Sequence, residues 1–229
     1  MPRPWIGFIP YLAIAIVHIV ALALGADAVA TPTKLALMPL LAVAVVWGAK
    51  GSSWTTAHTL LVAAIALSWL GDGAGVLFPW LPTVPTMLLW FGLAHLCFIW
   101  LFWRTLAVRP LPLWTAVYAA WWLALVALLW PEVGGLLVPV ALYGLVLGAT
   151  AAGAARCHPL IVWGGALFLA SDTVLAFRLF LPDAMPDWTS PVVMLTYCLG
   201  QGLLAAGVLA AVRAGSRDGV GAAASPGGS

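Results

Sequence analysis

Long apolar runs, interrupted by short clusters of proline, glycine and a few charged residues, follow one another along nearly the whole chain. Each run is close to the length of about 20 residues that an α-helix needs to cross a bilayer. We predict eight transmembrane helices from these runs, at about 5–25, 34–49, 55–78, 84–106, 111–130, 133–152, 158–181 and 190–212. The pattern therefore predicts an all-α, polytopic membrane bundle in which short connections make consecutive helices antiparallel.

The same pattern predicts one domain and a tail. The eight helices occupy residues 1–213 as a single transmembrane domain, because no interruption is long enough for a soluble domain. Residues 214–229 are rich in Gly, Ala and Ser, and we expect them to form a disordered C-terminal tail. The first run exceeds the apolar core of about 7–15 residues that a signal peptide has, so we predict a retained helix there.

Composition supports a membrane protein and excludes two other classes. Of the 229 residues, 64% are hydrophobic and 7% are charged, whereas a soluble domain has roughly 25% charged residues. The net charge of +2 provides no basic surface for a phosphate backbone, so we expect no nucleic-acid partner. The three cysteines, Cys97, Cys157 and Cys198, lack the spacing of a zinc site or a disulfide framework. We expect no metal and no cofactor; the oligomeric state is left open.

The few charges alternate between the predicted loops. Basic residues occur at the N-terminus, in the even-numbered loops and near the C-terminus (Arg3, Lys50, Arg104, Arg109, Arg156, Arg213, Arg217), whereas acidic residues occur in the odd-numbered loops (Asp27, Glu132, Asp183, Asp187). Short loops with excess Lys and Arg lie on the cytoplasmic side. We therefore predict a multi-pass protein of the cell (plasma) membrane with both termini cytoplasmic, in which only Lys34 and Arg178 break the pattern.

Several ionisable and polar residues fall inside the predicted spans. A charge in the hydrocarbon region costs at least a few kcal/mol, so such residues face the bundle interior and mark candidate functional sites. The candidates are His18, Lys34, Ser68, Asp72, His95, Asp172, Arg178, Tyr197 and Gln201. The alternating directions of the helices bring most of them into the outer half of the membrane. We expect a polar pocket there, with His18 as a packed polar residue outside it.

Two segments of the chain resemble each other at an offset of one hundred residues. Residues 66–72 read ALSWLGD and residues 166–172 read ALFLASD. A chance resemblance is one explanation, since the sequence is so apolar. The other is a repeat of four plus four parallel helices, which would place Asp72 and Asp172 opposite each other across a pseudo-twofold axis.

Four motifs in this order resemble the YhhN-type lysoplasmalogenase family of membrane proteins. They are SWLGD over 68–72, FGLAHL over 91–96, GALFLASDTVLA over 165–176 and TYCLGQ over 196–201. The segment TKL over 33–35 also resembles the family's second helix, although Leu35 stands where a proline is common. The resemblance extends from about residue 34 to residue 205.

The resemblance implies an enzyme that hydrolyses the vinyl ether bond of lysoplasmalogens to a fatty aldehyde and glycerophosphoethanolamine or glycerophosphocholine. Such a reaction needs one protonated and one ionised carboxyl group, which two buried aspartates can supply. Asp72 and Asp172 would be the catalytic pair. The remaining candidates would bind the lysophospholipid: His95, Tyr197, Gln201 and Ser68 at the water and glycerol hydroxyls, and Lys34 and Arg178 at the phosphate.

Two other functions remain open from the sequence. A transporter or lipid-binding membrane protein could use the same polar pocket, and the possible repeat is typical of transporters. A metal-dependent hydrolase could hold a metal with His95 and the aspartates, but neither HExxH nor another tight ligand spacing is present.

Overall fold

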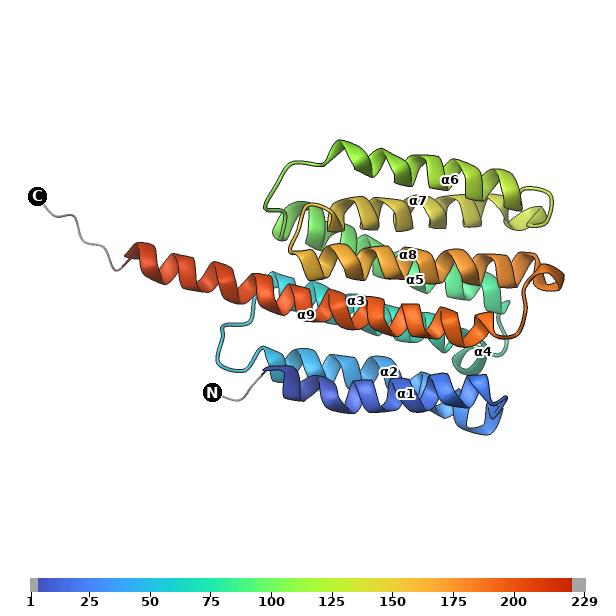
Figure 1. Ribbon diagram of the computed structural model, residues 1–229, viewed down its shortest axis with the longest axis horizontal. Coiled ribbons are helices and arrows are strands. Elements are labelled where there is room, and N and C mark those ends of the chain that lie inside the picture. Colours follow the sequence, from blue (N-terminus) through green and yellow to red (C-terminus); the bar gives the residue numbers. More distant parts are fainter. Residues whose placement is uncertain (1–3, 224–229) are drawn as a thin grey trace, which may run out of the picture.

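The computed structural model describes residues 4–223 of the chain, and within this range it is helical without strands. The main helices are α1 (Ile9–Ala23), α2 (Asp27–Gly48), α3 (Thr56–Asp72), α4 (Ala74–Leu77), α5 (Thr83–Trp100), α6 (Ala116–Leu129), α7 (Leu137–Ala154), α8 (Pro159–Phe180) and α9 (Thr189–Ala223). Short 3-10 turns lie at Pro4–Phe8, Leu113–Thr115, Gly134–Leu136 and Pro182–Ala184, and a π-helical turn at Leu101–Thr105 extends α5. Apart from the single turn α4, the helices lie side by side in one bundle (Figure 1).

The bundle has the apolar helices of a multi-pass membrane protein. Among the described residues, six segments are long and apolar enough to cross a membrane, namely Trp5–Ala23, Asp27–Gly48, Thr83–Thr105, Gly134–Ala154, Pro159–Phe180 and Thr189–Gly215. The two segments Thr56–Asp72 and Leu113–Leu129 are apolar but shorter, and they occupy the third and fifth predicted spans. At 1.5 Å per residue, the 17 residues of α3 reach about 25 Å, slightly less than a hydrocarbon core of about 30 Å. The all-helical membrane bundle is confirmed, and the count of eight spans stays a prediction.

Three predicted boundaries differ from the structure. Helix α2 begins at Asp27 instead of residue 34, so Lys34 lies in its third turn. The predicted span 55–78 is divided at Gly73, which makes Asp72 the last residue of α3. Helix α9 runs to Ala223, so residues 214–223 of the predicted tail are helical; residues 224–229 lie outside the described residues.

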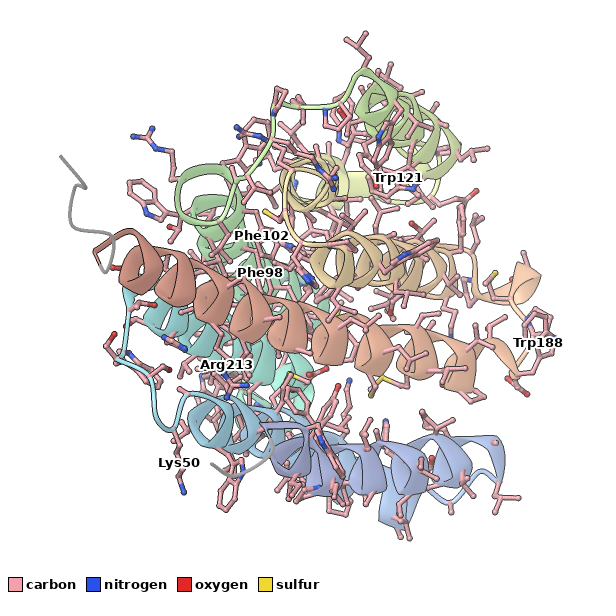
Figure 2. The ribbon with its side chains drawn as sticks, turned by 60° about the vertical axis from the view of Figure 1, so that its left-hand side comes forward. Lys50, Phe98, Phe102, Trp121, Trp188 and Arg213 are labelled. Carbon is pink, nitrogen blue, oxygen red and sulfur yellow. The ribbon has the colours of Figure 1, made fainter. Side chains whose placement is uncertain are left out.

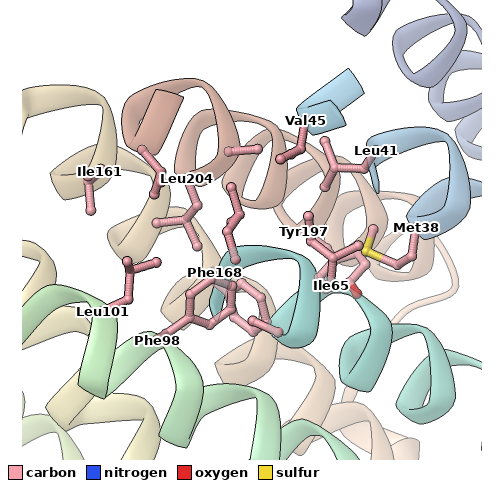
Figure 3. Close-up of a cluster of buried hydrophobic side chains, with 14 of the residues drawn as sticks. Met38, Leu41, Val45, Ile65, Phe98, Leu101, Ile161, Phe168, Tyr197 and Leu204 are labelled. Atoms are coloured by element: carbon pink, nitrogen blue, oxygen red, sulfur yellow. The ribbon is translucent and has the colours of Figure 1, made fainter. Parts of the chain in front are cut away.

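Glycines allow the central helices to pack closely, as small residues do in membrane proteins. A Cβ atom at Gly164 in α8 would lie 2.9 Å from the carbonyl oxygen of Gly200 in α9. A Cβ atom at Gly71 in α3 would lie 2.6 Å from the ring of Phe91 in α5. The core between these helix pairs is filled by aromatic and aliphatic side chains, including Phe98 and Phe168 (Figure 3). Gly71 and Gly164 are thus sites of close helix contact.

Several basic residues lie at one end of the bundle, whereas Lys34 and Arg178 do not. Lys50 and Arg213 lie toward that end and Trp188 lies at the opposite end (Figure 2). Arg213 donates a hydrogen bond to the carbonyl oxygen of Gly48, at the end of α2. In a neighbouring loop, Arg109 donates to the carbonyl oxygen of Ala155 over 2.9 Å. Within the described residues, the two ends of the bundle thus differ in charge, as the sequence predicts. The side of the membrane that each end faces stays a prediction.

The helices form two halves with matching neighbours. In the first half α1 contacts α2, α2 contacts α3, and α3 contacts α5. In the second half α6 contacts α7, α7 contacts α8, and α8 contacts α9. The halves meet where α5 contacts α7 and where α9 contacts α2, and α9 also contacts α1, whereas α5 and α6 have no contact of similar extent in the described part of the chain. The order of neighbours is compatible with a repeat of four plus four helices, although the contact of α1 with α9 departs from it.

Candidate active site

Asp72 is the centre of one polar cluster. The Tyr197 hydroxyl, from α9, donates a hydrogen bond of 2.7 Å to Asp72 Oδ2, and Lys34 Nζ, from α2, lies 3.7 Å from Oδ1. A carboxylate at the C-terminus of a helix faces the negative end of the helix dipole, which is unfavourable. The Lys34 ammonium offsets this cost, because it brings a positive charge to a side chain that is only 4% exposed. The three residues therefore form one cluster, as the sequence predicts.

Ser68 and Gln201 form a second link between α3 and α9, one turn away from the first. Gln201 Nε2 donates to Ser68 Oγ over 3.2 Å, and both side chains are fully buried. Ser68 precedes Asp72 by four residues and Gln201 follows Tyr197 by four, so the two links lie on the same helix faces. Since they bond to each other, Ser68 and Gln201 hold α3 and α9 in register beneath Asp72. This geometry suits a supporting role better than direct contact with a substrate.

Asp172 is the centre of the other polar cluster. It lies in α8 and accepts a hydrogen bond from the Tyr143 hydroxyl of α7. His95 Nε2, from α5, lies 3.9 Å from Asp172 Oδ2 and 3.4 Å from the Tyr143 hydroxyl oxygen. Asp172 and His95 are thus brought together as predicted. Tyr143 is not among the residues predicted from the sequence, although a tyrosine in an otherwise apolar helix is a signal for such a site.

The His95 ring is fixed in orientation. Its Nδ1 atom lies 3.2 Å from the Thr150 hydroxyl, which donates its own proton to the carbonyl oxygen of Val146 over 2.9 Å. With that proton at the carbonyl oxygen, Thr150 accepts from His95, so we assign the hydrogen of the imidazole to Nδ1, and Nε2 is directed at Tyr143 and Asp172. The edge of the ring packs against Phe168, with the ring centroids 4.9 Å apart. His95 is thus placed to exchange a proton with the Asp172 cluster through Nε2.

The two clusters are related by the two-half arrangement. Each aspartate binds one residue from the preceding helix of its own half, Lys34 for Asp72 and Tyr143 for Asp172. Each also faces one residue from the last helix of the other half, Tyr197 for Asp72 and His95 for Asp172. The partners of the two aspartates therefore come from corresponding helices, while their chemical groups differ.

Three adjoining pockets reach these clusters. The first, of about 260 Å³, is lined by Lys34 and Asp72. The second, of about 40 Å³, contains Asp172 and Tyr143 among apolar residues of α5, α6, α7 and α8. The third, of about 240 Å³, lies between α1, α2, α8 and α9 and shares Lys34 with the first. Met87 lines both the first and second pockets, and Leu175 lines both the second and third.

Arg178 is held at the mouth of the third pocket, away from the aspartates. Its Nη1 atom donates to the carbonyl oxygen of Pro186 over 3.1 Å and to the Thr189 hydroxyl. A guanidinium has five N–H donors, so these bonds leave others for a ligand. Arg178 reaches the Asp72 cluster only through the pocket that it shares with Lys34. The predicted pair of phosphate ligands is thus present on one pocket.

The metal hypothesis requires both aspartates beside His95. In the structure His95 pairs with Asp172, whereas Asp72 pairs with Lys34. No group of three or more His, Cys, Asp or Glu side chains that could hold a metal ion occurs within the described part of the chain.

Comparison of the chain with known proteins identifies the family to which it belongs. No curated protein and no solved structure matches the chain. The model of the YhhN family matches residues 29–208, which include both aspartate clusters and all three pockets except the α1 and Asp27 side of the third. The chain, a helical membrane protein with two buried aspartate clusters, therefore belongs to the YhhN family.

Proposed function

We propose that this protein hydrolyses the vinyl ether bond of lysoplasmalogens. The proposal depends on one observation: two buried aspartates, each accepting a tyrosine hydrogen bond, line two separate pockets, and a third pocket with charged residues adjoins both. The pocket beside Asp172 is apolar and suits the start of an alkenyl chain. The pocket beyond Lys34 is lined by charged groups and suits a phosphate-bearing headgroup. A lysophospholipid lying across both would pass between the aspartates.

The hydrogen-bond partners suggest which aspartate acts as the acid and which acts as the base. Both partners of Asp72, the Lys34 ammonium and the Tyr197 hydroxyl, can donate hydrogen bonds to an ionised carboxylate. Asp172 lies beside His95 Nε2, which can accept a proton or return one. We assign Asp172 the role of acid and Asp72 that of carboxylate base.

The reaction then proceeds in two steps. Asp172 gives its proton to the outer carbon of the vinyl ether, and the Asp72 carboxylate stabilises the positive oxocarbenium ion that results. A water molecule gives a proton to Asp72 and adds its oxygen to the cationic carbon, forming a hemiacetal. In the second step Asp172 takes the hemiacetal hydroxyl proton and Asp72 protonates the leaving glycerol oxygen. The products are a fatty aldehyde and the glycerophospho compound, and both aspartates return to their starting states.

A transport or binding role is the second candidate, because the matching halves resemble the repeats of transporters. One experiment separates the two. The detergent-purified full chain is incubated with a lysoplasmalogen and with the matched ester lysophospholipid, and the products are identified by mass spectrometry. Aldehyde from the vinyl ether without fatty acid from the ester supports the proposal. Fatty acid would indicate a lysophospholipase, and neither product would favour binding or transport.

Variants of the aspartates test the assigned residues. Asp72→Asn and Asp172→Asn keep the size of each side chain and remove its ionisable proton. Loss of acid or base catalysis commonly costs about 10²–10⁴-fold in rate, so each variant should lose at least about 100-fold of aldehyde release. Folding is checked by the elution profile and helical circular dichroism. Near-normal turnover by either variant would contradict its catalytic role.

A further inference from the structure

The third pocket carries charges of both signs. It is lined by Asp27 and Lys34 of α2 and by Arg178 of α8, together with the uncharged polar groups of His18 and Ser190. The two cations suit a phosphate, as proposed above. Asp27 and His18 are not needed for a phosphate, and a carboxylate beside a phosphate would be repulsive. The pocket therefore points to a ligand that has a positive group as well as a negative one.

His18 provides an independent observation. Its side chain is 1% exposed, it lines this pocket, and its Nε2 atom has no hydrogen-bond partner among the described residues. Its Nδ1 atom lies 3.0 Å from the hydroxyl oxygen of Thr33. That hydroxyl directs its proton at backbone carbonyl oxygens, those of Val29 at 2.6 Å and Ala30 at 3.0 Å. With its proton at these carbonyl oxygens, Thr33 accepts from His18, and we assign the hydrogen of the imidazole to Nδ1.

The tautomer determines what His18 offers to the pocket. With the hydrogen on Nδ1, the neutral imidazole has a lone pair on Nε2 and accepts a hydrogen bond there. Buried acceptors without a partner are rare in folded proteins, and each is unfavourable. A ligand that donates an N–H to this atom would satisfy it.

We infer that the third pocket binds the phosphoethanolamine headgroup of the lipid, with Arg178 and Lys34 at the phosphate and Asp27 and His18 Nε2 at the primary ammonium. This assignment rests on the proposed function, because it places the headgroup of the same substrate. It adds two residues that neither the motifs nor the aspartate clusters point to. Lys34 links the pockets, since it lines both this one and the pocket of Asp72.

The two new residues recognise the ammonium in different ways. Asp27 attracts any cation at the rim of the pocket, so it favours ethanolamine and choline alike. His18 Nε2 needs an N–H donor, which a primary ammonium has and a quaternary ammonium lacks. His18 is therefore the residue that selects ethanolamine over choline. A hydrogen bond to a charged group contributes about 1.5–3 kcal/mol, which corresponds to a preference of about tenfold or more.

The test measures binding, so that it does not depend on hydrolysis. The full chain in nanodiscs is titrated with the ester lysolipids of one acyl chain and three headgroups: phosphoethanolamine, phosphocholine and phosphoglycerol. The wild-type protein should bind the ethanolamine lipid about tenfold more tightly than the choline lipid. Equal affinities for these two lipids would overturn the inference.

A matched pair of variants isolates Nε2. In His18→Asn the shorter amide can keep an N–H at Thr33 but has no atom at the position of Nε2, so the preference for ethanolamine should disappear. In His18→Gln the longer amide can place an oxygen near that position, so part of the preference should return. Unchanged choline affinity in both variants shows that the pocket is intact. A full preference retained in His18→Asn would contradict the role of His18.

The variant Asp27→Asn tests whether the negative charge of Asp27 attracts the cationic headgroup. Ethanolamine and choline affinities should fall by the same factor, and phosphoglycerol affinity should stay constant or rise. A loss for ethanolamine alone, or equal losses for all three lipids, would overturn the role of Asp27. The two proposals fail separately: aldehyde release without headgroup selection would sink only the inference, and selection without aldehyde release would sink only the hydrolase.

Discussion

The Tyr143 hydroxyl in α7 donates its hydrogen bond to the Asp172 carboxylate in α8. The same hydroxyl oxygen lies 3.4 Å from His95 Nε2 in α5, so Tyr143 joins the aspartate and the histidine. Its place in the second half corresponds to that of Lys34 in the first, because each lies on the helix before an aspartate-bearing helix. In the proposed reaction Tyr143 holds the acid in position, while Lys34 carries a charge to the other aspartate.

Tyr143→Phe should therefore impair catalysis without unfolding the protein. The ring stays to fill its space, and only the hydroxyl that binds Asp172 is lost. We expect kcat for aldehyde release to fall about 10- to 100-fold, within the range for loss of one positioned hydrogen-bonding group in catalysis. Tyr118→Phe, in α6 on the outer α6–α7 groove, is the matched control and should keep its activity. An unaffected kcat in Tyr143→Phe would show that the hydroxyl only supports packing.

Lys34 should act on the phosphate of the substrate. Lys34→Gln removes the ammonium from the two pockets that it lines. We expect KM for a lysoplasmalogen to rise about tenfold, the size of one charge-assisted hydrogen bond. A 1-alkenylglycerol, which has no phosphate, is the matched control substrate. Equal losses for both substrates would indicate instead that Lys34 acts mainly through Asp72, with which it pairs at 3.7 Å.

The contact between α8 and α9 should be sensitive to side-chain size. Gly164→Leu would push a side chain against the backbone of Gly200, where even a Cβ atom would lie 2.9 Å from the carbonyl oxygen. Overpacking of this kind costs about 1–3 kcal/mol or more, so we expect a lower apparent Tm in detergent. Gly92→Leu is the control, because a Cβ atom at Gly92 meets nothing within 4 Å. Equal Tm values for both variants would mean that α8 and α9 do not pack as described.

The charge pattern predicts the orientation of the protein in the membrane. A green fluorescent protein fused to the C-terminus should fluoresce in a bacterial host, because the basic loops and the termini are expected on the cytoplasmic side. Alkaline phosphatase fused at the same point should be inactive. The opposite pair of results would place the basic end outside.

The sequence predicts the number and order of the apolar segments well, because membrane helices depend on local composition. It places Lys34 at a helix start and Asp72 within a long span, and both placements are wrong. Helix α2 continues through Pro32 to Asp27, and α3 stops at Asp72 before Gly73. A proline near the start of a helix can lie inside the helix or before it, and a glycine can end a helix or lie within it. Tertiary packing decides between these cases, and a single sequence does not contain that information.

The site is predicted in part for a similar reason. Ionisable residues inside long apolar runs are easily recognised, so the sequence alone identifies Asp72, Asp172 and His95. Tyr143 was missed because tyrosine is common at membrane interfaces, and its function depends on a neighbour 29 positions away. The sequence predicts His18 as a packed polar residue, whereas in the structure it lines a pocket and its buried Nε2 atom has no hydrogen-bond partner among the described residues. Only three-dimensional contacts distinguish a satisfied polar atom from an unsatisfied one.

The opposite polarity of the pockets on either side of the aspartates has a consequence for what leaves the protein. In the proposed reaction one molecule is cut at the boundary between a charged pocket and an apolar one. The aldehyde remains where hydrocarbon is the better solvent and can diffuse into the bilayer. The glycerophospho compound loses its anchor and can dissolve in water. Cleavage itself would thus separate the two products into different phases, so that neither would need to be carried past the other.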